Sequence, residues 1–127
     1  MLADREAQAT IAVKDLEAAR KFYGETLGLK PTGPQDTEVQ TYQSGNSKVL
    51  VYRSQFAGTN KATAATWGLG DEFEGAVQAL KKKGVVFEHY DLPGLTRKGD
   101  VHVAEKEKFK AAWFKDPDGN ILNIHSG

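Results

Sequence analysis

The two halves of this 127-residue sequence repeat one order of predicted elements, and the repeat limits the folds open to the chain. A strand over residues 7–13 precedes a helix that Asp15 can cap, and a strand over 63–69 precedes a helix that Asp71 can cap. The remaining predicted strands cover residues 38–43, 48–53, 85–90, 109–114 and 120–125. This shared order, repeated about 56 residues apart, indicates an internal duplication.

The last predicted hairpin contains the segment WFKDPDGNILNI at residues 113–124. Pro117 fixes its own φ at about −65°, and Gly119 tolerates the positive φ that such turns require. The segment lacks the spacing and the terminal Glu of an EF-hand calcium loop. We therefore interpret it as a turn between two strands and not as an ion site.

Composition excludes several classes of function. Seventeen Lys and Arg residues balance 17 Asp and Glu residues, so no net charge favours nucleic acid or an anionic membrane. The chain has no cysteine, which excludes disulfides, thiolate ligands and cysteine nucleophiles. No apolar run approaches the ~20 residues of a membrane span, and no apolar signal segment follows Met1. We expect a soluble cytoplasmic protein without nucleic-acid or membrane partners.

Three segments together resemble the vicinal oxygen chelate superfamily, which includes glyoxalase I, bleomycin-resistance proteins, fosfomycin-resistance enzymes and extradiol dioxygenases. They are IAVKDLEAARKFY at 11–23, LGL at 27–29 and FKDPDGN at 114–120. The resemblance implies an α+β fold in which two βαβββ modules form an open, curved mixed sheet around a pocket. It also implies a homodimer. Residues 1–127 would form one domain, with module one at about 7–54, a linker at 55–62 and module two at about 63–126.

Active members of the superfamily hold a divalent metal on four side chains, two from each module. The resemblance and strand parity place these positions at Gln8, Tyr52, Ala64 and Asn123. Gln is a ligand in one branch of glyoxalase I, which keeps a metal site open. Ala64 cannot ligate, and no carboxylate or imidazole remains among the four, whereas divalent ions require such donors. We therefore expect no metal and no other cofactor.

The expected pocket residues follow from the same strand parity and from the polar linker before the second module. Gln8, Thr10 and Ala12 should face the pocket, while Ile11 and Val13 face the helix. The complete set of expected ligand-contacting residues is Gln8, Thr10, Tyr52, Asn60, Thr66, Trp113 and Asn123.

No catalytic residue can be assigned from the sequence, although three side chains could supply acid–base chemistry. Glu88 and Tyr90 should share one strand face, and we interpret this strand end as solvated. His102 lies in a charged segment that predicts an exposed loop, and His125 lies at a chain end that we expect to be frayed.

Two functions remain open. The first is a glyoxalase/bleomycin-resistance-like protein that binds a small organic molecule in its pocket without a metal. The alternative is a glyoxalase-like lyase or isomerase, or a dioxygenase-related enzyme, with an atypical metal site. Bleomycin itself is not expected as the ligand, because the resemblance there goes with an acidic surface and this chain is neutral.

Overall fold

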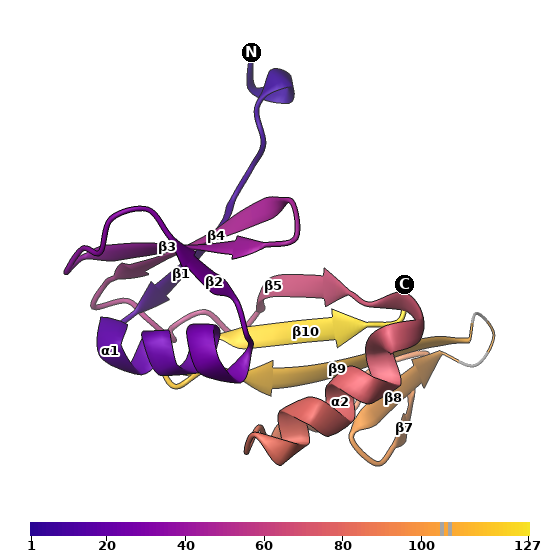
Figure 1. The fold of residues 1–127 in the computed structure, drawn as a ribbon. Helices are drawn as coiled ribbons and strands as arrows, with labels where there is room; N and C mark the ends of the chain where they lie inside the picture. The colour runs from indigo at the N-terminus through magenta and orange to yellow at the C-terminus, as the bar shows by residue number, and fades with distance from the viewer. Residues whose placement is uncertain (105, 107) are drawn as a thin grey trace. The chain divides into compact units, whose positions relative to one another are not determined.

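A computed structural model describes residues 1–104, 106 and 108–127. The chain forms two compact units, in each of which a helical segment accompanies a sheet (Figure 1). The first unit comprises Met1–Ala64 and Asp116–Asn120. The second comprises Ala65–Lys115 and Ile121–Gly127.

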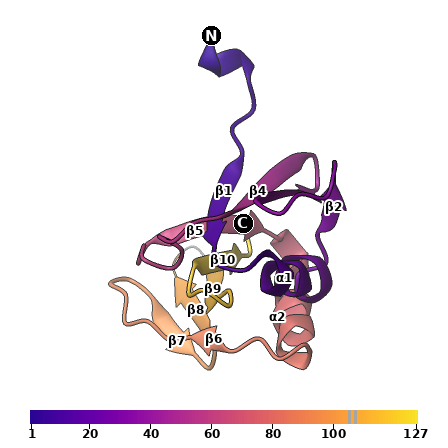
Figure 2. The ribbon, with the colours of Figure 1, turned by 90° about the vertical axis from the view of Figure 1, so that its left-hand side faces the viewer.

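The first unit follows the predicted order of a strand, a helix and further strands. Its elements are η1 (Leu2–Asp4), β1 (Ala9–Val13), α1 (Leu16–Ala19), the π-helix η2 (Arg20–Thr26), β2 (Lys30–Thr32), β3 (Val39–Ser44) and β4 (Ser47–Arg53). Asp15 caps α1 as predicted, accepting a hydrogen bond from the Glu17 amide at 2.9 Å. Figure 2 looks along the axis of this helical segment. Strand β2 was not predicted, because Pro31 and its neighbours suggested a break in the chain.

The first sheet has the order β1-β4-β3-β2, with β1 parallel to β4 and the other pairs antiparallel. Ile11 and Val13 are each only 1% exposed, which confirms that their side of β1 faces the core. Tyr23 of η2 and Tyr42 of β3 are fully buried on the same side, with ring centroids 6.1 Å apart. The helical segment therefore covers one face of the sheet, while Thr10 and Tyr52 lie on the other face.

The turn Asp116–Asn120 belongs to the first unit, and it is a turn, as predicted. The Asp116 carboxylate accepts hydrogen bonds from the Tyr23 hydroxyl at 2.6 Å and from the Asn120 side-chain amide at 2.8 Å. It also accepts from the backbone amides of Asp118 and Asn120, both at 2.9 Å. Burial, reinforced by the Asp116 charge, raises the pKa of Tyr23. The Tyr23 hydroxyl therefore stays protonated and donates.

The second unit repeats this order with an additional short hairpin. Its elements are β5 (Thr63–Gly68, whose first residues fall in the first unit), η3 (Gly70–Glu72), α2 (Phe73–Lys82), β6 (Phe87–Glu88), β7 (Thr96–Lys98), β8 (Val101–Ala104), β9 (Phe109–Lys115) and β10 (Ile121–His125). The predicted cap at Asp71 is wrong. Asp71 lies inside η3, and α2 begins after Glu72 without a side-chain cap. The predicted strand 85–90 is shorter than expected.

The second sheet has the order β5-β10-β9-β8-β7, and β6 pairs with another stretch of β9. Strands β5, β10 and β9 therefore occupy the places of β1, β4 and β3 in the first sheet, as a duplication requires. Phe87 and Phe114 are buried with ring centroids 5.8 Å apart. Phe73 and Val77 of α2 are also buried, so one face of the sheet packs on the helix.

These elements confirm the predicted α+β fold class. Among the described residues, no helix is long and apolar enough to cross a membrane.

Candidate functional site

One face of the second sheet carries polar and aromatic side chains. Asn123 and Glu88 both pair with Trp113, and His102 and His125 both pair with Ala111. Paired residues on neighbouring strands point to the same side, and positions 111 and 113 share that side. We call this surface the polar face; its members are Thr66, Glu88, Tyr90, His102, Trp113, Asn123 and His125. The buried Phe87, Phe114 and Leu122 have the opposite parity.

Asn123 is held firmly on the polar face and is only 7% exposed. Its side-chain nitrogen donates to the Ala112 carbonyl at 3.2 Å, and its oxygen accepts a hydrogen bond from the Thr66 hydroxyl. Since the nitrogen must face a carbonyl, the amide has one orientation. The structure therefore brings together two residues that the sequence places 57 positions apart.

Trp113 lies at the centre of an aromatic cluster on the polar face. Its ring centroid is 4.9 Å from that of His102 and 5.7 Å from that of Tyr90, and both pairs meet edge to face. The Tyr90 and His102 centroids are 6.1 Å apart. The indole is half-buried, so it contributes apolar area beside the polar groups.

The prediction that His102 lies in an exposed loop is wrong. His102 is in β8 and only 1% exposed. The strand was not predicted because charged residues lie on both sides of it, and such runs are typical of solvated segments. The dipeptide Gly99-Asp100 between short strands was the available signal, since it is typical of two-residue hairpin turns. Lys98 indeed pairs with Val101 across it.

Both orphan polar atoms of the aromatic cluster are buried. The His102 Nε2 lies 3.0 Å from the Tyr90 amide nitrogen and 3.1 Å from the Tyr90 carbonyl oxygen. The His102 Nδ1 and the Tyr90 hydroxyl have no hydrogen-bond partner in the described structure. Burial raises the pKa of Tyr90, and the Glu88 charge adds to the shift. The phenol is therefore protonated at neutral pH.

His125 is not frayed, contrary to the prediction. It is part of β10, and its ring lies on Phe109 with centroids 5.4 Å apart. Its Nδ1 accepts a hydrogen bond from the Gly127 amide at 3.1 Å, which leaves the proton on Nε2. A Cβ at Gly68 would lie 2.9 Å from its Cε1, so Gly68 makes room for the ring.

Glu88 is half-buried and lies 3.3 Å from the Lys115 ammonium, so the predicted solvated strand end is only partly correct. Its neighbour His89 is exposed and pairs with Asp100 at 2.8 Å. Hydrogen bonds from Lys81, and then from His89, lower the pKa of Asp100. That ion-pair group lies at the surface.

The expected ligand-contacting residues of the first unit are all exposed. Thr10 pairs with Leu50, and Ala12 pairs with Tyr52, so Thr10 and Tyr52 face the side away from the helix. Gln8 is exposed immediately before β1. Asn60 lies in the linker, where its side-chain oxygen accepts from the Ala62 amide at 3.0 Å.

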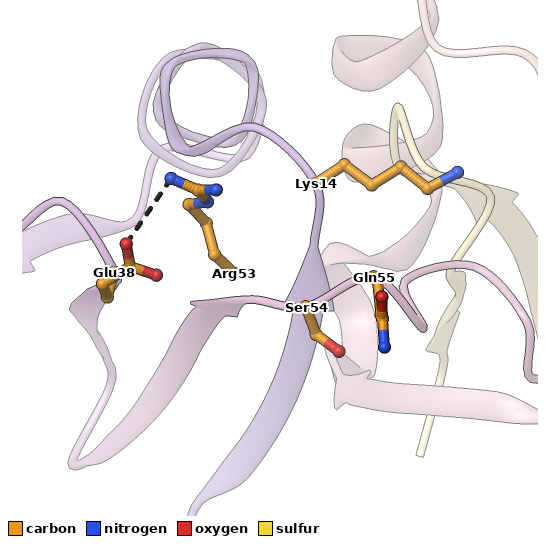
Figure 3. Close-up of a pocket in the computed structure, with 5 residues that line it drawn as sticks. All are labelled: Lys14, Glu38, Arg53, Ser54 and Gln55. Atoms are coloured by element: carbon orange, nitrogen blue, oxygen red, sulfur yellow. Dashed lines mark hydrogen bonds and ion pairs between the residues drawn. The ribbon is translucent and has the colours of Figure 1, made fainter.

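The first unit also contains an open pocket that the sequence did not reveal (Figure 3). It has a volume of about 330 Å³ and is lined by Lys14, Glu38, Arg53, Ser54 and Gln55. Arg53 pairs with Glu38 at 3.5 Å, and in Figure 3 the Lys14 side chain points away from this pair. The parallel pairing of β1 with β4 places Val13 beside Arg53, so Lys14 and Arg53 lie at the same end of the sheet.

The four positions that the resemblance assigns to metal ligands carry a donor set that fits a divalent ion poorly. Ala64 offers no donor atom, and the oxygen of Asn123 already accepts the Thr66 hydrogen bond. Gln8 and Tyr52 add a neutral amide and a phenol, whereas divalent ions are held by imidazole and carboxylate. Over residues 1–104, 106 and 108–127, no three His, Asp or Glu side chains are arranged to hold an ion.

Solved structures with the same fold cover nearly the whole chain. A glyoxalase family protein from Enterococcus faecalis is 18% identical, with a TM-score of 0.74 over 98% of this chain and 99% of that one. An integron cassette protein from the mobile metagenome of a Halifax Harbour sewage outfall is 22% identical, with a TM-score of 0.71 over 94% and 96%. A bleomycin-binding protein in complex with bleomycin is 17% identical, with a TM-score of 0.70 over 97% and 98%.

At these identities the structural likeness shows the fold alone. No curated protein sequence matches the chain. The family model of the Glyoxalase/Bleomycin resistance protein/Dioxygenase superfamily matches residues 7–124, and this match confirms the resemblance noted in the sequence. The chain therefore belongs to the Glyoxalase/Bleomycin resistance protein/Dioxygenase superfamily.

Proposed function

We propose that this protein binds a small organic molecule on the polar face without the help of a metal ion. The observation that carries the proposal is the hydrogen-bonded pair of Thr66 and Asn123. At a position where the resemblance implies a metal ligand, this chain has a neutral amide that is hydrogen-bonded to its neighbours. Trp113 adds apolar area beside it, and small-molecule sites combine such area with a few placed polar groups.

The test of the metal-free proposal compares metals directly. Protein purified without chelators is analysed for its elemental content, and its melting temperature is measured with Ni²⁺, Zn²⁺ or Mn²⁺ and with EDTA. We expect no stoichiometric metal and no shift in melting temperature, because a ligand that binds only the native state would raise it. A stoichiometric ion together with a large shift would contradict the proposal.

The ligand site is tested by variants of the polar face. Relatives include the bleomycin-binding protein and the fosfomycin resistance protein FosX from Mesorhizobium loti, so bleomycin and fosfomycin are named probes beside a fragment panel. Thr66→Val should weaken the binding of a hit about five-fold, because it removes the hydrogen bond that holds the Asn123 amide. The exposed Thr96 of β7 gives the matched control, Thr96→Val, which should leave binding unchanged. Equal effects of the two variants would remove the polar face from the proposal.

A second candidate function is an enzyme of the superfamily with an atypical metal site. The observation in its favour is that Glu88, His102 and His125 share the polar face, where acid–base groups could act on a ligand. Assays of lactoylglutathione-lyase activity with and without Ni²⁺ test it. Turnover that Glu88→Gln abolishes would favour the enzyme over the binding protein.

We also propose a cytoplasmic homodimer, as the family resemblance implies. Light scattering after size-exclusion chromatography tests the stoichiometry. A monomer across the micromolar range would contradict the proposal.

A further inference from the structure

The hydrogen bonds of His102 determine where its proton lies. The Tyr90 amide hydrogen points at Nε2 over 3.0 Å, and no other acceptor for it is present in the described structure. Buried amide hydrogens are almost never left unpaired, whereas carbonyl oxygens more often are. With Nε2 as the acceptor of this bond, the imidazole proton lies on Nδ1, and Nε2 does not donate to the Tyr90 carbonyl at 3.1 Å.

This assignment makes both unpaired groups of the aromatic cluster hydrogen-bond donors. His102 Nδ1–H is buried without an acceptor, and so is the hydroxyl of Tyr90 in the contacting ring. The elevated pKa of Tyr90 keeps that hydroxyl protonated. A buried donor without an acceptor destabilises the folded state, so two such donors in adjacent rings are unfavourable for a purely structural cluster.

We infer that Tyr90 and His102 are a donor pair for an oxygen acceptor of the ligand, a carboxylate or a ketone, carried on a planar group that contacts Trp113. The inference rests on the proposed small-molecule function and names the class of its ligand. A carboxylate or ketone can accept a hydrogen bond from each of the two donors. An ammonium or another donor-only group cannot accept either bond, so it and both protein donors would stay unpaired. The edge-to-face contacts of Trp113 with both rings place its indole beside the donors.

The experiment uses benzoate and acetophenone as acceptor probes and benzylammonium as a donor-only probe of similar ring. Each is titrated into labelled full-length protein, and the imidazole nitrogens are followed by NMR. The free protein should show the Nδ1–H form of His102. Benzoate or acetophenone should shift the Nδ1 signal, and benzylammonium should not.

Paired variants separate a ligand contact from a structural role. Tyr90→Phe removes a hydroxyl that has no partner, so affinity for the acceptor probe should fall about ten-fold while the melting temperature stays equal or rises. His102→Gln keeps a hydrogen-bonding atom near the Nε2 position but has no donor at the Nδ1 position, so affinity should fall. His102→Asn keeps one near Nδ1, so it should retain affinity and lose stability. Tyr42→Phe removes an unpaired buried hydroxyl from the first unit and serves as the control.

The inference is overturned if the acceptor probes leave His102 and Tyr90 unshifted, or if benzylammonium binds equally. It is also overturned if Tyr90→Phe lowers the melting temperature without changing affinity. Probes that shift Thr66 and Asn123 alone would overturn this inference and leave the proposed function standing. If no probe shifts any residue of the polar face, both fail.

Discussion

The turn Asp116–Asn120 and the pair of Tyr90 and His102 both bury polar groups, but they differ in whether those groups have hydrogen-bond partners. Each of the two carboxylate oxygens of Asp116 accepts two hydrogen bonds. Tyr23, whose hydroxyl donates one of them, is fully buried. The Tyr90 hydroxyl and His102 Nδ1 are buried as well, yet neither has a partner among the described residues. A satisfied buried network stabilises a fold, whereas unsatisfied groups cost stability and are expected where a ligand completes them.

The largest effect should come from removing the centre of the satisfied network. Asp116→Ala leaves four donor hydrogens without their acceptor, so we expect the free energy of unfolding to fall by about 3–5 kcal/mol. Urea denaturation measures it. Asp118→Ala is the control, because that carboxylate accepts one bond, from the Lys14 amide at 3.2 Å, and should cost below about 1 kcal/mol. Similar losses in both variants would contradict the central role of Asp116.

A substitution at Gly58 tests how closely the backbone packs against the turn. A Cβ at this residue would lie 1.9 Å from the Asp118 carbonyl oxygen, and its φ is +73°. Gly58→Ala should therefore lower the free energy of unfolding by about 3 kcal/mol. Gly45 also has a positive φ of +56° but no atom near the added methyl, so Gly45→Ala should cost about 1 kcal/mol. Equal costs would mean that the close approach to Asp118 is easily relieved.

Two Tyr→Phe variants compare the regions directly. Tyr23→Phe removes a 2.6 Å hydrogen bond to a buried carboxylate and should cost about 2 kcal/mol. Tyr90→Phe removes a hydroxyl without a partner and should change stability by less than about 0.5 kcal/mol, or increase it. Thermal and urea denaturation of both variants give the comparison. A stability loss in Tyr90→Phe that matched Tyr23→Phe would remove the distinction between the regions.

The last comparison concerns alkaline pH. The pKa of Tyr23 is raised in the folded state, so above about pH 10 the unfolded chain loses a proton that the folded chain keeps. Stability should then fall with rising pH by up to about 1.4 kcal/mol per pH unit for each such group. Burial also raises the pKa of Tyr42 and of Tyr90, so Tyr23→Phe should reduce the slope without abolishing it. An unchanged slope would argue that Tyr23 does not contribute.

The sequence predicted those parts of the fold that depend on local chemistry. The turn chemistry of Pro117 and Gly119 and the alternation around Ile11 and Val13 indicated the hairpin and the buried side of β1. They did so because these signals lie within a few residues. Strand β8 escaped prediction because it is short and flanked by charges. Its burial depends on pairing with β9, which a local pattern does not contain.

The candidate site was predictable only in part. Strand parity placed Thr66, Trp113 and Asn123 among the pocket residues, and the structure puts these three on one sheet face. The contact between Tyr90 and His102 joins residues on different elements, and its two unpaired donors depend on side-chain geometry. Neither the spacing of the residues nor their types predict such a pair.

The chain enters the first unit twice, because Asp116–Asn120 belongs there while the strands on both sides of it belong to the second unit. The duplicated halves are consequently not two independent pieces of protein. A fragment that ended at Ala64 would lack the carboxylate that accepts the Tyr23 hydrogen bond, and the complementary fragment would carry that turn without its tyrosine. Separately expressed halves should therefore each be incomplete, and the first unit could be restored only by mixing them.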